Sequence, residues 1–179
     1  QRQMCIRDRN MPDKNDITMN MWMKGEKDRE VFSALSPMTE GLSRIKGMPY
    51  DIKKQPTLTF VARQKGEAWT RPFVSIFEPV TKSSPSVIAS VEYPSVVSDG
   101  QSDSDVAIKV NLKDGNQDLI LSSDSNANVC SSENIQTKSS YSVCRTKNGS
   151  PVLVFMGNGT YFKGSGIEIK SESPANILV

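Results

Sequence analysis

The sequence contains no histidine among its 179 residues. Histidine is the commonest general base near neutral pH and the commonest metal ligand in proteins. Serine-histidine triads, Cys-His dyads and histidine-based zinc sites are therefore excluded within this chain. Only three cysteines are present, Cys5, Cys130 and Cys144, and none belongs to a CxxC pair. We expect no metal site and no cofactor.

Long apolar runs and concentrated positive charge are also missing. No run approaches the roughly 20 apolar residues that cross a bilayer, so we expect no membrane span. The 22 basic residues are scattered among 20 acidic ones, for a net charge of +2. A nucleic-acid-binding surface concentrates positive charge, so we expect no nucleic-acid partner. With 36% hydrophobic residues, the chain is large enough for one domain with its own core.

Two groups of residues leave alternatives open. Cys130 and Cys144 form a disulfide if the protein is exported and their Cα atoms lie close enough, and are otherwise buried free thiols. Asp99, Asp103 and Asp105 offer hard oxygen ligands for calcium. Their spacing does not match an EF-hand loop, so solvated turn residues are the favoured interpretation.

Residues 1–16 have no structural pattern. They begin with the charged run QRQMCIRDR, lack apolar periodicity, and end in Asn, Pro and Asp residues typical of loops. The string MCIRDR resembles a translated sequencing-adapter read-through. We therefore expect a disordered, non-native lead-in, with an ordinary flexible N-terminus as the alternative.

From Ile17 onward the chain reads as a succession of strands. The segments are short, rich in Val, Ile, Phe, Tyr and Thr, and separated by turn residues. In residues 17–23 the methionines alternate with polar residues and Trp22, as in a half-buried strand, and we expect the methionines to face the core. No segment keeps a helical period beyond two turns. About ten strands predict an all-β fold, an antiparallel β-sandwich over residues 17–179, with a closed barrel as the alternative.

Turn residues indicate where the strands reverse. Asp114-Gly115, Asn148-Gly149 and Asn158-Gly159 supply the positive φ of tight hairpins, and each pair is expected to close one. The polar stretches 98–105 and 122–140 are expected to be loops or solvated edges.

Residues 57–80 carry the candidate binding residues. They predict a strand, a tight connection and a second strand. Trp69 offers a flat face for stacking on a sugar ring, while Arg63, Lys65 and Arg71 offer donors for carboxylate or sulfate groups. In extended chain Trp69 and Arg71 point to the same side. The segment thus suits an acidic polysaccharide, with Trp69, Arg71 and Arg63 as the substrate-binding residues.

A structural interpretation of the same residues stays open. In it Trp69 packs on the hairpin, and the cations pair with Glu67 and Glu78.

The segment also carries a sequence motif. A strand ending in a basic residue, residues 61–64, leads through Gly66 to the run F-V-S-I-F-E-P at residues 73–79. This arrangement resembles the C-terminal region of heparinase II/III-like polysaccharide lyases, whose second strand has the form F-V-x-[VI]-[YF]-E-P. The resemblance extends over residues 17–113, and beyond them only the strand rhythm continues.

The resemblance implies the C-terminal accessory β-sandwich of an enzyme that cleaves acidic polysaccharide by β-elimination. Its catalytic helical toroid lies upstream in the same polypeptide and would be this domain's partner. A periplasmic or extracellular location in a bacterium is also implied. The family's catalytic and metal-binding histidines map onto no position here, and no tyrosine lies in a matching segment. We therefore carry over no catalytic residue.

Two other functions stay open. The first is a non-catalytic carbohydrate-binding module, which would line aromatic residues along one face. The second is a structural β-domain of a cell-surface protein. An exposed apolar patch near the N-terminus would favour the accessory domain, because a separated interface leaves such a patch.

Overall fold

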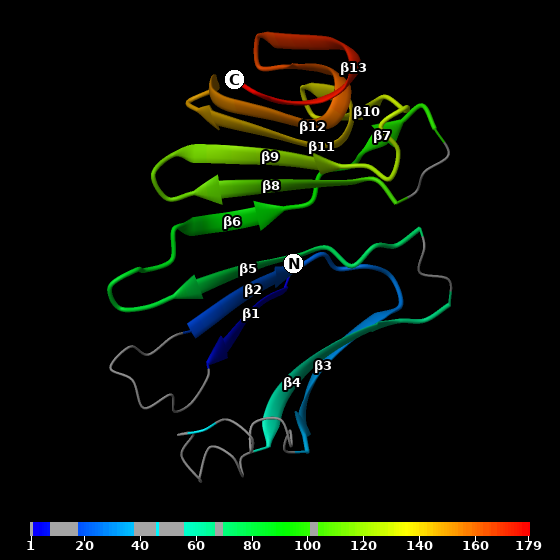
Figure 1. Cartoon of the computed structure of the whole chain (residues 1–179). Coiled ribbons are helices and arrows are strands. Elements are labelled where there is room, and N and C mark those ends of the chain that lie inside the picture. Colours follow the sequence, from blue (N-terminus) through cyan, green and yellow to red (C-terminus); the bar gives the residue numbers. More distant parts are fainter. Residues whose placement is uncertain (1, 8–17, 38–45, 47–55, 67–69, 101–103) are drawn as a thin grey trace.

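The computed structural model describes residues 2–7, 18–37, 46, 56–66, 70–100 and 104–179. Within these residues the regular elements are thirteen strands, without a helix, and the strand pairs are antiparallel. The expected all-β antiparallel class is therefore confirmed (Figure 1). Since this part of the chain has no helix, it has none long enough to cross a membrane.

The strands follow one another along the whole chain. The first seven are β1 (Arg2–Arg7), β2 (Thr18–Met23), β3 (Arg29–Ser36), β4 (Thr57–Gln64), β5 (Ser75–Val80), β6 (Ile88–Glu92) and β7 (Val97–Ser98). The next six are β8 (Val106–Leu112), β9 (Asn116–Ser122), β10 (Cys130–Ser132), β11 (Ile135–Lys147), β12 (Ser150–Gly164) and β13 (Ile167–Leu178).

Three sheets result from the pairing. One is the three-stranded sheet β1-β2-β5, and another is the hairpin β3-β4. The largest has eight strands in the order β13-β12-β11-β9-β8-β6, with β10 paired to β11 and β7 paired to β10. In Figure 1 β5 runs beside β6, and the β3-β4 hairpin projects away from the eight-stranded sheet.

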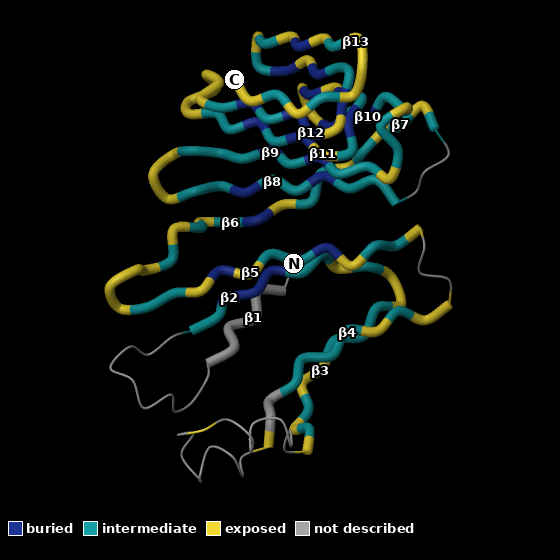
Figure 2. Tube along the Cα trace, viewed as in Figure 1, coloured by how far each residue is buried: buried dark blue, intermediate teal, exposed yellow. Residues whose placement is uncertain are grey.

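The eight-stranded sheet folds over on itself. The first part of β11 pairs with β10 and the end of β12, whereas its second part pairs with β9 and the start of β12. Register shifts in β11 and β12 mark the bend. One cluster of buried side chains joins both parts, so they face each other across a common core, as in a sandwich (Figure 2). Its largest fully buried members are Phe162, Ile135, Met156 and Val154.

A second, smaller core joins the three-stranded sheet to the large one. Trp22 of β2 is only 5% exposed and packs with Val91 of β6 and Val110 of β8, with Ile76 of β5 beside them. The expected methionine face is partly buried, and Met21 is 2% exposed. Both faces of β2 are thus covered, and it is the Trp22 face that contacts the rest of the protein.

Asn158-Gly159 does not close a hairpin, contrary to the sequence expectation. Both residues lie inside β12, where Asn158 has φ 50° and forms a bulge. The side chain of Asn158 donates to Ser140 Oγ at 3.0 Å, and its backbone N–H donates to Asn176 Oδ1 at 2.8 Å. A Cβ on Gly159 would lie 2.8 Å from the Lys138 carbonyl oxygen. The pair therefore bends a strand instead of reversing the chain. The other two predicted turns do connect β8 to β9 and β11 to β12.

The stretch 122–140, expected to be a loop or a solvated edge, instead contains β10 and the beginning of β11. Its polar residues are buried because they satisfy one another. The hydroxyl groups of Thr137, Ser139 and Ser142 form a closed triangle with sides of 2.7, 2.9 and 2.9 Å, and each residue is 1% exposed. A serine-rich strand can therefore enter the core without unpaired polar groups.

The N-terminal residues differ from the expected disordered lead-in. Arg2–Arg7 pair with β2 over six residues as the edge strand β1. Without it, β2 would present a row of unpaired backbone groups, which favours the pairing of any adjacent extended segment. Residues 8–16 lie outside the described part, and the division into a lead-in and a single domain over residues 17–179 stays a prediction.

The two later cysteines are separate buried thiols. The Sγ of Cys130 lies 3.2 Å from Asp105 Oδ2, and the Sγ of Cys144 lies 3.6 Å from Ser165 Oγ. Burial raises the pKa of both thiols, so they are poor nucleophiles. Cys130 and Cys144 are parts of the core.

Candidate functional site

Of the three predicted substrate-binding residues, Arg63 and Arg71 are described and Trp69 lies outside the described residues. The predicted alignment of Trp69 with Arg71 therefore stays a prediction. Arg63 lies near the end of β4, and Arg71 lies in the connection between β4 and β5.

Arg63 is held by a carboxylate from the neighbouring strand. It is paired in register with Glu30 of β3, and its Nη2 and Nε atoms lie 2.6 and 2.7 Å from Glu30 Oε2. Lys65 Nζ reaches Glu30 Oε1 at 3.1 Å. Hydrogen bonds from Arg63 and Lys65, together with their charges, lower the pKa of Glu30. The partner of Arg63 and Lys65 is thus Glu30, which the cross-strand register determines and the local sequence does not.

This ion-pair group retains one positive charge at the surface, because two cations share one carboxylate. Arg63 is 61% exposed, and its guanidinium lies 5.8 Å from the centre of the Phe32 ring. Phe32 itself is 43% exposed. A cation above an exposed ring can contact both the charged groups and the apolar face of a sugar.

Arg71 belongs to a second group, which is organised by Arg29. The Nη2 of Arg29 donates to the carbonyl oxygens of Arg71 and Pro72 at 2.6 and 3.3 Å, and Nη1 donates to the Lys24 carbonyl at 3.2 Å. The Arg29 guanidinium also lies 4.3 Å from the centre of the Phe73 ring. The rigid fork of arginine donors thereby fixes the β4–β5 connection to the end of β2.

The structure separates Arg63 from Arg71 instead of joining them in one contact. Arg29 pairs with Gln64, the neighbour of Arg63 in β4, and side chains alternate between the two faces of a strand. Arg29, which holds the Arg71 carbonyl, therefore points to the face of the hairpin opposite Arg63. No sequence signal points to Arg29, because its role depends on the carbonyl groups of Arg71 and Pro72, which are distant in the chain.

The Arg71 group has unbalanced positive charge. Burial lowers the pKa of Arg29, and the neighbouring charge of Arg71 lowers it further, whereas Glu26 raises it. Within the described part of the chain no carboxylate forms an ion pair with Arg71. Two nearby cations with one carboxylate, Glu26, as counter-charge favour an anionic ligand.

The motif residue Glu78 has a structural role. It is 8% exposed. Its Oε1 accepts the backbone N–H groups of Val87 and Ile88 at 2.7 and 3.1 Å, and its Oε2 accepts from Asn20 Nδ2 at 3.2 Å. Glu78 therefore joins β5 to β2 and to the start of β6.

The described tyrosines with shifted pKa values do not resemble catalytic bases. Burial raises the pKa of Tyr93 to about 12, and burial together with Asp118 raises the pKa of Tyr141. A general base works best with a pKa near the operating pH. Both shifts are in the opposite direction from the one that would activate a tyrosine.

The three aspartates considered as alternative calcium ligands do not form a site in the described residues. Asp99 Oδ1 accepts the backbone N–H of Val129 at 2.7 Å, Asp105 contacts Cys130, and Asp103 lies outside the described residues. No group of three metal-ligating side chains occurs in this part of the chain.

Comparison with known proteins gives one significant similarity. A segment of 75 residues, 42% of this chain, is 33% identical to an endo-acting ulvan lyase from Formosa agariphila. The segment spans only 8% of that enzyme's length. No protein-family model matches the sequence. The chain is thus related in sequence to a polysaccharide lyase over part of its length.

Proposed function

We propose that this chain is an accessory β-sandwich of a polysaccharide lyase that cleaves acidic polysaccharide, such as ulvan, by β-elimination. The observation that carries the proposal is the 33% identity with an endo-acting ulvan lyase. Within this proposal, the resemblance of residues 73–79 to the motif of heparinase II/III-like lyases supports a relation to that group. The catalytic domain of the same polypeptide is its partner, and the location is periplasmic or extracellular.

Three features of the molecule support a non-catalytic role. The sequence has no histidine to serve as a base. The two tyrosines with shifted pKa values are shifted upward, and the most specific motif residue, Glu78, is used in hydrogen bonds between strands. The function left to the chain is to support the enzyme and to contact its substrate.

The cations at the β3-β4 end of the molecule provide those contacts in the proposal. Arg63 and Arg71 hold the acidic groups of the polymer, and Trp69 stacks on a sugar ring. The exposed Phe32 and Phe73, 43% and 47% exposed, add apolar surface on the two faces of the hairpin.

The test is to incubate the purified chain with ulvan and to follow the ultraviolet absorbance of the unsaturated uronate that an elimination produces. We expect no increase above a buffer control, while an active ulvan lyase gives a rise on the same substrate. A reproducible rise that scales with the concentration of this chain would refute the accessory role. Sequencing the source DNA upstream of the Ile17 codon gives an independent check, since the proposal requires an in-frame catalytic domain there.

A further inference from the structure

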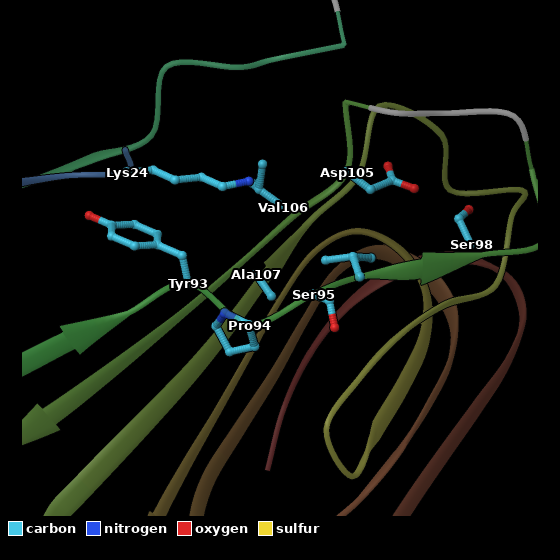
Figure 3. Close-up of a pocket in the computed structure, with 9 residues that line it drawn as sticks. Lys24, Tyr93, Pro94, Ser95, Ser98, Asp105, Val106 and Ala107 are labelled. Atoms are coloured by element: carbon cyan, nitrogen blue, oxygen red, sulfur yellow. The ribbon is translucent and has the colours of Figure 1, made fainter. Parts of the chain in front are cut away.

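A pocket of about 320 Å³ lies where the end of β2 meets the segment between β6 and β7. This volume is at the lower end of the range for small-ligand sites. In the view of Figure 3, Lys24 and Tyr93 lie on one side of the pocket and Asp105 and Ser98 on the other. The lining residues are Lys24, Tyr93, Pro94, Ser95, Val96, Ser98, Asp105, Val106 and Ala107.

The lining has the chemistry of a site for a charged and hydroxylated ligand. The ammonium of Lys24 forms no ion pair with a carboxylate of the described residues, so it is available to an anionic group. Asp105 supplies acceptors for hydroxyl groups. Tyr93 and Pro94 supply apolar ring surface of the kind that packs against the C–H groups of a sugar.

Two buried oxygens of the lining residues have unused hydrogen-bonding capacity. Tyr93 Oη and Asp105 Oδ1 have no partner among the described residues. Asp105 uses its other oxygen to accept from Cys130 at 3.2 Å. Buried polar groups in proteins are nearly always paired. A donor and an acceptor left over on two residues of one pocket favour a ligand that both accepts and donates hydrogen bonds.

The pocket adjoins the Arg71 group. The carbonyl oxygens of Lys24 and Arg71 both accept hydrogen bonds from the one guanidinium of Arg29. Arg29 therefore holds together the backbones of Lys24, which lines the pocket, and of Arg71, which forms no ion pair with a carboxylate of the described residues.

We propose that this pocket binds one acidic sugar unit, with its carboxylate or sulfate at Lys24 and its hydroxyl groups at Asp105 and Tyr93. The identity of the polymer that contains this unit rests on the proposed function. The anionic and hydroxylated character of the ligand is inferred from the residues that line the pocket. The pocket thus extends the substrate contacts from the hairpin end to the junction of the two cores.

The test measures binding of ulvan oligosaccharides to the full chain by isothermal titration calorimetry, with dextran as the uncharged probe. We expect Lys24→Gln to weaken ulvan binding by about tenfold, the effect of losing one charge-assisted contact. The matched control is Lys170→Gln, which removes the same charge from β13, where Lys170 pairs with Glu168. This control should bind ulvan as the unchanged chain does, and dextran should bind to none of them.

Tyr93→Phe separates a binding role from a structural one. Because Tyr93 Oη has no hydrogen-bond partner in the described part of the chain, its removal should leave the melting temperature unchanged or slightly higher. Ulvan affinity should fall by about threefold to tenfold, as expected for one lost hydrogen bond. Equal ulvan affinity for Lys24→Gln, Tyr93→Phe and the unchanged chain would overturn the pocket proposal, and so would the absence of ulvan binding by the unchanged chain. Neither result refutes the accessory role, which is decided by the lyase assay and the upstream sequence.

Discussion

Removal of the Glu78 carboxylate should destabilise the junction between the two cores. In Glu78→Ala, three donors lose their acceptor: the Asn20 side chain and the backbone N–H groups of Val87 and Ile88. Each buried donor left unpaired costs about 1–3 kcal/mol. Because Val87 is 59% exposed, water can replace part of that loss. We expect the free energy of unfolding to fall by about 2–4 kcal/mol.

The measurement is urea unfolding followed by tryptophan fluorescence and far-ultraviolet circular dichroism. Trp22 lies in the adjacent core, so its emission reports on this junction. Glu78→Gln keeps a carbonyl acceptor and should lose only about 1 kcal/mol. The control Glu172→Ala changes an exposed carboxylate of β13 and should stay within about 0.5 kcal/mol. If Glu78→Ala is as stable as this control, the structural role assigned to Glu78 is wrong.

The same carboxylate gives a pH dependence with a defined sign. Burial alone would raise the pKa of Glu78, but hydrogen bonds from Asn20, Ser86 and two backbone amides outweigh it, so the pKa lies below its ordinary value of 4.5. A lowered folded-state pKa contributes stability above the unfolded-state value, and this stability is lost as the pH falls through the folded-state pKa. Acid should therefore destabilise the unchanged chain more than Glu78→Gln below about pH 4.5.

Two further substitutions test the bend in β12 and the proposed contact surface. Gly159→Ala should lower the free energy of unfolding by about 1–3 kcal/mol, because a Cβ would lie 2.8 Å from the Lys138 carbonyl oxygen. Gly25→Ala, at a position with open space, is the control, and equal melting temperatures would contradict the close approach. Trp69→Ala should weaken acidic-polysaccharide binding by about 1 kcal/mol without lowering the melting temperature. A loss of about 3–5 kcal/mol of stability would instead place Trp69 in a core.

The sequence predicts the strands better than their connections. Period-2 segments such as residues 106–112 and 117–122 are strands, and Asp114-Gly115 closes the hairpin between β8 and β9. Asn158-Gly159 has the same local signal but forms a bulge, because the backbones of β11 and β12 approach closely there. The burial of residues 135–142 was also missed. Their hydroxyl groups pair with one another only after the strand has folded.

The sequence predicted which types of residue occur at the candidate site. It did not predict which residues contact them. Arg63 and Arg71 were identified as cations, yet Glu30 and Arg29, which hold them, lie more than 30 residues earlier in the chain. Those contacts depend on the register of β3 against β4. Lys24 likewise belongs to the pocket only because β2 ends beside the segment that follows β6. Such contacts between distant parts of the chain cannot be predicted from the local sequence.

The residues that carry the family resemblance mainly hold the strands together. The resemblance therefore says more about the fold than about the ligand. Ile76 packs in the second core, Glu78 joins three segments by hydrogen bonds, and Val74 accepts the Lys24 backbone N–H at 2.9 Å. A motif of this kind reports a shared arrangement of strands, and it can persist in domains that bind different polymers. The charges at Lys24, Arg63 and Arg71 are independent of that arrangement, because none of their side chains holds strands of the two cores together. Under the proposed function, these surface cations are therefore the residues that decide substrate preference, and exchanging them should change binding while leaving the fold intact.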